Sequence, residues 1–115
     1  MTERFRLRWT ESAVLDLEAI LDHIAERDSV AVAAAARVHE RIIARIDSLQ
    51  KLARRGRRIP ELKALGVTEY REWIVNPYRV CFRLVGRDVV LLAILDGRRN
   101  VEDLLIERAL RFEAD

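Results

Sequence analysis

The chain has 115 residues, of which half are hydrophobic and 35% are charged; this balance predicts one globular domain and excludes a disordered or fibrous protein. The formal net charge is +2, and arginine supplies nearly all of the basic side chains because lysine occurs only twice. No apolar run approaches the roughly 20 residues of a membrane span, and residues 1–8 are charged rather than leader-like, so we expect a cytoplasmic protein that does not use a membrane.

The first half of the chain predicts a strand followed by a helical hairpin. Residues 5–9 alternate apolar side chains with arginines, which is the period of a half-buried strand. Thr10 suits the cap of a helix over about residues 11–26, and Asp28 or Ser29 suits the cap of a second, longer helix. Because the turn between the helices is short, we expect them to lie antiparallel.

The second half predicts three strands and a last helix. An arginine-rich segment, residues 54–58, ends the second helix, and its Gly56 suits the left-handed position that often follows a helix. Residues 59–66 form a loop with room for one helical turn. Asn100 suits the cap of the last helix. Strands are expected before that helix at residues 70–75, 79–85 and 89–95.

This order of elements, β-α-α-β-β-β-α, predicts a single domain of the α+β class over residues 1–115. We expect a small, twisted, mainly antiparallel sheet with the N-terminal helical hairpin packed on one face. The third strand of the second half is almost wholly apolar, which is typical of a central strand that is covered along much of its length.

Several kinds of chemistry find no support in the residues. His23 and His39 are the only histidines, and both lie on predicted helices away from a plausible nucleophile. Cys81 is the only cysteine, and its apolar surroundings favour a buried structural thiol. No metal-ligand spacing, glycine-rich phosphate loop or nucleophile elbow occurs, so we expect neither a metal nor a cofactor.

Arginines gather instead on the predicted sheet. Arg71 shares a strand face with Trp73, Arg79 shares one with Arg83, and Arg98 and Arg99 follow the last strand. If the hairpin covers the apolar face, these guanidinium groups converge on one open surface that also holds Tyr70 and Tyr78. Such a face suits a polyanion with stackable bases. The alternative is that these arginines form ion pairs with the acidic neighbours Glu69, Glu72 and Asp96 and only solvate the sheet.

The stretch YREWIVNPYRVCFRL, residues 70–84, followed by ILDGRRN, residues 94–100, resembles the sheet of the RelE/ParE superfamily of toxins. The whole chain is similar to that family's layout. Its sharpest marks are the R-x(7)-R spacing of Arg71 and Arg79, the turn from Arg57 to Pro60, and the GRR that ends at Arg99. The resemblance implies the toxin of a type II toxin–antitoxin pair, held by a small antitoxin protein.

RelE-like members of this superfamily cleave messenger RNA on the ribosome without a metal. By position, Arg71, Arg79 and Arg99 match basic residues of that catalytic set. However, Trp73 replaces a second strand lysine, and Leu105 stands near the place of a C-terminal tyrosine. Related nucleases have a histidine where this chain has Asp96. Because arginine remains protonated, the matching residues could stabilise charge but could not act as a base.

ParE-like members instead poison DNA gyrase and need no active site. The long hairpin with its row of Arg37, Arg41 and Arg45 at i, i+4 spacing favours that branch and marks the row as a candidate partner surface. Acidic neighbours such as Glu40 and Asp47 are the alternative explanation of the row. We therefore expect gyrase inhibition ahead of RNA cleavage. A non-toxic module that binds only its partner or RNA is the third hypothesis.

Overall fold

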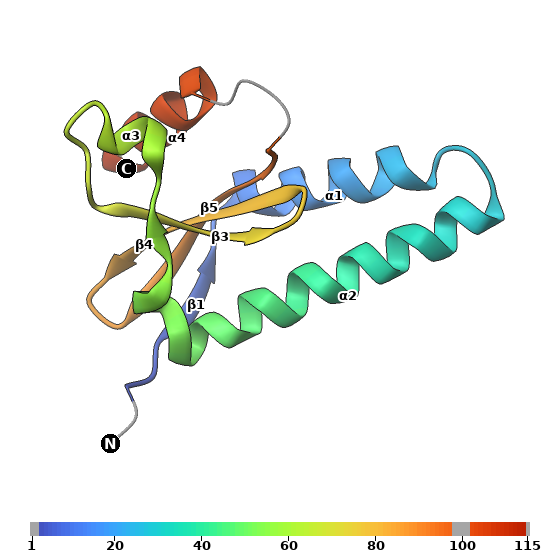
Figure 1. The fold of residues 1–115 in the computed structure, drawn as a ribbon, viewed down its shortest axis with the longest axis horizontal. Helices are drawn as coiled ribbons and strands as arrows, with labels where there is room; N and C mark the ends of the chain where they lie inside the picture. Colours follow the sequence, from blue (N-terminus) through green and yellow to red (C-terminus); the bar gives the residue numbers. More distant parts are fainter. Residues whose placement is uncertain (1–2, 98–101, 115) are drawn as a thin grey trace.

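A computed structural model describes residues 3–97 and 102–114 (Figure 1). All of the predicted helices and strands are present, with ends shifted by one or two residues. The elements in chain order are β1 (Arg6–Trp9), α1 (Glu11–Ala25), α2 (Ser29–Leu52), the 3-10 turn η1 (Ala53–Arg55), β2 (Arg57–Arg58), α3 (Pro60–Lys63), β3 (Tyr70–Val75), β4 (Tyr78–Val85), β5 (Asp88–Asp96) and α4 (Glu102–Ala114). The turn η1 and the two-residue strand β2 were not predicted, and Asn100 lies outside the described residues.

The five strands form one sheet in the order β1-β5-β4-β3-β2. Only β1 and β5 run parallel; the other neighbours are antiparallel, which confirms the predicted mainly antiparallel sheet. Opposite β4, the strand β5 holds one extra residue, because Cys81 pairs with Ala93 while Phe82 pairs with Leu91. This bulge at Leu92 turns the side chains that follow it to the other face.

The helical hairpin packs on one face of the sheet, as predicted. The Thr10 hydroxyl accepts a hydrogen bond from the backbone N–H of Ala13, and the Asp28 carboxylate accepts one from Ala31, so both predicted caps are confirmed. The buried core on this face includes Leu17 from α1. It also contains these buried side chains of α2, β4 and β5: Ile42, Ile46, Leu49, Val80, Phe82 and Leu91. Figure 1 shows the turn of the hairpin projecting well beyond the sheet.

The other face of the sheet is covered as well, which corrects the expectation of an open surface. Figure 1 shows α3 and α4 on the side opposite α2. They enclose a second core, whose buried members are Ile59, Leu62, Tyr70, Cys81, Leu92, Ala93, Leu95 and Leu105. The apolar character of β5 therefore reflects burial on both faces. The single cysteine is fully buried here, which confirms a structural thiol, and burial raises its pKa.

A polar clamp ties α4 to the sheet beside the bulge. The Arg108 guanidinium donates two hydrogen bonds of 2.9 Å to the Asp16 carboxylate, and a third of 3.0 Å to the carbonyl of Leu92. Asp16 also accepts a 3.0 Å bond from the backbone N–H of Ile94. These side chains satisfy backbone groups of β5 beyond its pairing with β1, as burial requires.

Gly56 does not adopt the predicted left-handed conformation. Its φ and ψ are −62° and 139°, which is ordinary extended backbone. The need for glycine is steric: a Cβ atom at this position would lie 2.6 Å from Cζ of the Phe82 ring. The segment between α2 and β2 can therefore lie directly against the sheet because residue 56 has no side chain.

Candidate functional site

The strand register separates the two arginines of the R-x(7)-R motif. Arg71 lies opposite Phe82, whose ring is in the core beneath the hairpin. Arg79 lies opposite Ile74, and its side chain emerges on the other face together with that of Glu72. Because side chains alternate along a strand, the expectation that these arginines converge on one surface is wrong.

Arg71 holds the end of the helical hairpin. Its Nη1 atom donates to the backbone carbonyls of Arg54 at 3.0 Å and Gly56 at 2.9 Å. Desolvation, followed by the nearby charges of Arg58 and Arg54, lowers the pKa of the Arg71 guanidinium. This arginine thus satisfies carbonyl groups of η1 and of the residue that follows it, and so has a role in the fold.

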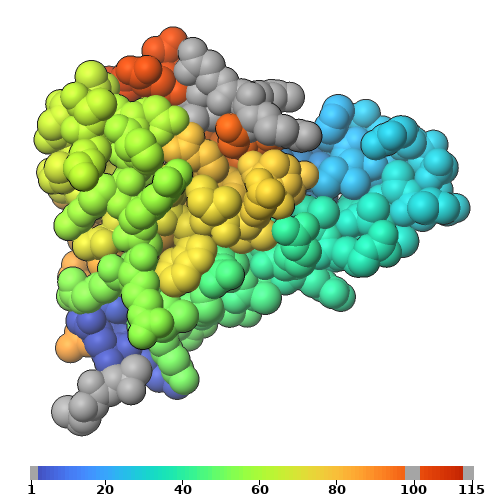
Figure 2. Space-filling view, in the orientation of Figure 1, coloured from blue at the N-terminus to red at the C-terminus, as the bar shows by residue number. Residues whose placement is uncertain are grey.

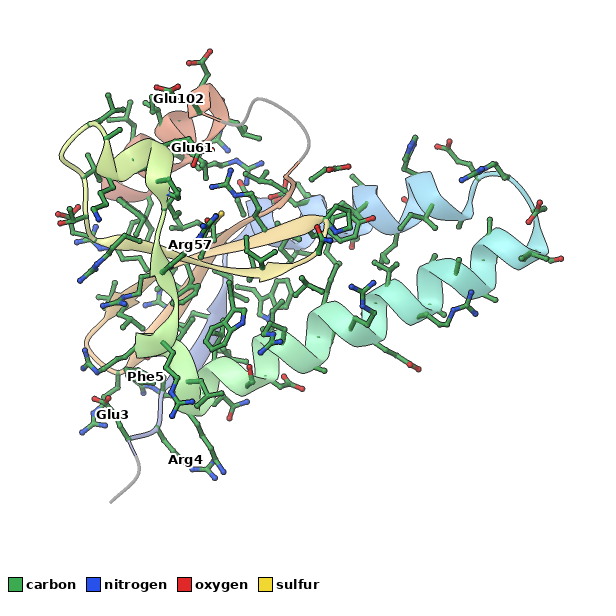
Figure 3. The ribbon with its side chains drawn as sticks, in the orientation of Figure 1. Glu3, Arg4, Phe5, Arg57, Glu61 and Glu102 are labelled. Atoms are coloured by element: carbon green, nitrogen blue, oxygen red, sulfur yellow. The ribbon has the colours of Figure 1, made fainter. Side chains whose placement is uncertain are left out.

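Arg79 is enclosed by carboxylates. Its Nε atom donates to Glu72 at 2.6 Å, while Nη1 and Nη2 donate to the two Glu61 oxygens at 2.6 and 2.7 Å. Arg57 adds a 2.6 Å bond to the second oxygen of Glu72. We call these four residues the Arg79 cluster; Figure 3 labels Arg57 and Glu61, which approach from β2 and α3. The cluster contains two cations and two anions and is formally neutral.

Burial differs within the cluster. The side chain of Glu72 is 0% exposed and that of Arg79 is 10% exposed, whereas Glu61 is 28% exposed. Hydrogen bonds to Glu61 are the largest cause that raises the pKa of Arg79, and the same bonds hold the pKa of Glu61 below its ordinary value. The predicted alternative, pairing with Glu72, is confirmed for Arg79. The second partner, Glu61, was missed because it lies in a segment expected to be a loop.

The aromatic residues of the expected nucleic-acid face are not available for stacking on bases. Tyr70 is 2% exposed, and Tyr78 is 8% exposed within the core under the hairpin. Arg83 lies between Tyr70 and Phe112 of α4, with its guanidinium carbon 5.5 Å from each ring centroid. Tyr78 and Arg83, both predicted as contact residues, are therefore engaged in packing. Arg98 and Arg99 lie outside the described residues.

The arginine row on α2 borders a shallow groove. Arg45 lies over the Trp73 ring at 4.9 Å from its centroid, and Arg41 donates to the carbonyl of Asn76 at 3.0 Å. Arg37 is exposed. Within the described ranges, no ion pair joins this row to Glu40 or Asp47, so the acidic-neighbour explanation is not supported. We call the depression of about 490 Å³ the α2–β3 groove; it is lined by Arg41, Ala44, Arg45, Ser48, Ile74, Val75 and Asn76.

Figure 2 shows the β3–β4 region at the surface between α2 and the segment around α3. The groove thus opens where the edge of the sheet meets the hairpin. Ile74 is 39% exposed and lines this groove at the edge of the sheet, beside two cations. Trp73, predicted as a contact residue, packs beneath Arg45 on the hairpin side of the sheet and does not itself line the groove.

The carboxylates nearest to Arg79, those of Glu61 and Glu72, are both held in ion pairs. Leu105 is buried in the second core, and no cluster of metal-ligating side chains occurs among residues 3–97 and 102–114. The described helices include none that is long and apolar enough to cross a membrane. The arrangement can bind anionic or apolar protein surface at the α2–β3 groove, whereas the two motif arginines serve the fold.

Comparison with known proteins agrees with this architecture. Residues 7–101 match the family model described as ParE toxin of type II toxin–antitoxin system, parDE. The chain is 36% identical over 86 residues to Toxin ParE3 of Caulobacter vibrioides, covering 75% of this chain and 80% of that protein. A structure titled "Chromosomal ParDE TA system from P. aeruginosa" superposes with a TM-score of 0.63 at 24% identity, covering 81% of this chain and 96% of that one. The chain belongs to the ParE family, the toxins of type II toxin–antitoxin systems.

Proposed function

We propose that this toxin inhibits growth in the cytoplasm by poisoning DNA gyrase, and that a small cognate antitoxin blocks it. Membership of the ParE family supports the first part. The observation that carries it is the Arg79 cluster, in which two carboxylates neutralise the arginine that a nuclease would direct at a phosphate. Inhibition by binding a protein target requires no such free cation.

The rival function, cleavage of messenger RNA, has weaker support. Arg71 and Arg79 lie on opposite faces of the sheet, and each is held by groups of this chain. Neither can act as a base, because arginine remains protonated. Trp73 lies beneath Arg45 where nuclease chemistry requires an ionisable group. The carboxylates beside Arg79, Glu61 and Glu72, are held in ion pairs, and the hydrogen bonds to Arg79 lower the pKa of Glu61, which makes it a weaker base.

For the antitoxin, we propose the α2–β3 groove as a principal contact. Its cations Arg41 and Arg45 suit an acidic segment, and the exposed Ile74 side chain suits an apolar anchor. Complementary charge would speed association and fix the register of the bound segment. Arg37 extends the same positive row along α2 and would contact the next part of the segment.

The experiment is induced expression in a bacterial host with and without the antitoxin. We expect growth arrest, DNA damage and filamentation, with bulk messenger RNA intact, and rescue by the antitoxin. Mapped cuts within codons of translated messages would favour the RNA-cleaving alternative. Normal growth at confirmed soluble expression would favour a module that only binds its partner.

A further inference from the structure

Glu61 occupies the position on Arg79 that an external oxyanion would take. Its two oxygens accept one hydrogen bond each from Nη1 and Nη2, at 2.6 and 2.7 Å. This fork-to-fork geometry is the one by which arginine binds either a carboxylate or a phosphate. The third hydrogen bond of Arg79, from Nε, goes to the fully buried Glu72 and orients the guanidinium independently of Glu61.

The fold therefore depends on the two carboxylates to different degrees. Glu72 binds both Arg57 and Arg79 from inside the protein. Glu61 stands on the four-residue helix α3 and is partly exposed, and among the described side chains its ion-pair partner is Arg79. Neutralising Glu61 would leave the cluster with two cations and one anion, and the guanidinium would still be oriented by Glu72.

A groove next to the cluster offers room for a ligand. It has a volume of about 360 Å³ and is lined by residues that include Arg57, Glu61, Arg79 and Gly97. Gly97 packs closely against the stem of Arg79, because a Cβ atom at residue 97 would lie 3.2 Å from the stem carbons Cγ and Cδ. The guanidinium thus faces this groove on a supported stem, with Glu61 between it and solvent.

We propose that Glu61 is a specificity-determining residue whose carboxylate excludes the phosphodiester backbone of single-stranded RNA from this groove, and that neutralising it converts the groove into a phosphate-binding site. The inference goes beyond the proposed function, since it holds whether or not gyrase is the target. It assigns to one side chain the occupation of the Arg79 guanidinium, which would otherwise be open to a phosphate.

The test compares wild type with Glu61→Gln, which keeps the size of the side chain and removes its charge. The matched control is Glu69→Gln, because Glu69 is exposed and its replacement changes the net charge equally. The probe is a short labelled poly-U strand, followed by fluorescence anisotropy at several salt concentrations. We expect E61Q to bind at least about tenfold tighter than wild type, as one regained charge-assisted contact allows. E69Q should stay within about threefold of wild type, because an exposed charge is screened.

The salt dependence gives a second readout. Each additional phosphate neutralised on a single strand steepens the slope of log K against log salt by about 0.7, so E61Q should show a steeper slope than both other proteins. Glu61→Asp, which retains a carboxylate, should behave as wild type. Equal affinities and slopes for all four proteins would overturn the proposal. So would an equal gain in E69Q, since that would be an effect of net charge alone.

Stability is followed in parallel, because E61Q also replaces one of the two acceptor oxygens that face Arg79 with an NH2 donor. Melting is measured in sulfate and in chloride at matched ionic strength, with sulfate as the probe for an oxyanion on Arg79. Sulfate should raise the melting temperature of E61Q more than that of wild type or E69Q. If sulfate has the same effect on all three, no oxyanion replaces Glu61, and the proposal fails even where E61Q is only partly stable. A gyrase assay on wild type tests the proposed function separately.

Discussion

Replacing Arg79 with alanine removes the cation that lies between Glu61 and Glu72. Glu72 is fully buried, so the substitution leaves a carboxylate inside the protein with Arg57 as its one remaining partner in the cluster. Removing one member of a buried ion pair typically costs about 3–5 kcal/mol. Because Arg57 remains, we expect the lower end, about 3 kcal/mol, which lowers the melting temperature of a domain of this size by roughly 10–15 °C.

The assay is urea and thermal unfolding of Arg79→Ala beside Arg6→Ala. Arg6 also pairs with a carboxylate, Asp88, but its side chain is 79% exposed, so its loss should cost no more than about 0.5 kcal/mol. A cycle with Glu72→Gln isolates the coupling between Arg79 and Glu72, which should lie between about 0.5 and 3 kcal/mol. If R79A unfolds at the same urea concentration as R6A, the neutralised cluster is not structural and Arg79 is available for a ligand.

Three further predictions concern other parts of the molecule. Arg41→Ala should weaken antitoxin binding about tenfold, as measured by calorimetry at low salt. The control Arg27→Ala, which lies on the exposed hairpin turn, should leave the affinity unchanged. Equal affinities of the two variants would place the antitoxin elsewhere. Gly56→Ala should cost about 1–3 kcal/mol by urea unfolding, because its Cβ would meet Phe82, and an unchanged midpoint would contradict the packing. The pKa of Glu61 is lowered in the folded state, so its ion pair contributes to stability above the ordinary glutamate pKa, and this contribution is lost as the pH falls through the folded-state pKa. The difference in unfolding free energy between wild type and E61Q should therefore shrink on acidification. A difference that stays constant with pH would contradict the Glu61–Arg79 ion pair.

Most of the fold could be predicted from local signals. The caps at Thr10 and Asp28 and the alternation of residues 5–9 are read directly from neighbouring residues, and the structure has them in place. The cover provided by α3 and α4 could not be placed in this way, because it depends on contacts between distant segments. Its one local signal was the apolar strand β5, which is buried on both faces.

The candidate site was predicted less well, and the reasons are physical. Once Val75 and Tyr78 pair across the turn, Arg71 must lie opposite Phe82, and this register alone puts it on the other face from Arg79. That signal was present in the sequence. The Glu61 contact was not, because a carboxylate 18 residues from its partner, on a single helical turn, leaves no periodic pattern in the sequence.

The most direct test of the central claim is the action of the purified toxin on purified gyrase and relaxed plasmid, measured as supercoiling and as trapped double-strand breaks. We predict loss of supercoiling with accumulation of cleaved plasmid, reversed when the antitoxin is added before the toxin. A parallel reaction with ribosomes and a defined message should leave that message intact. Unaffected gyrase together with a message cut on the ribosome would contradict the account.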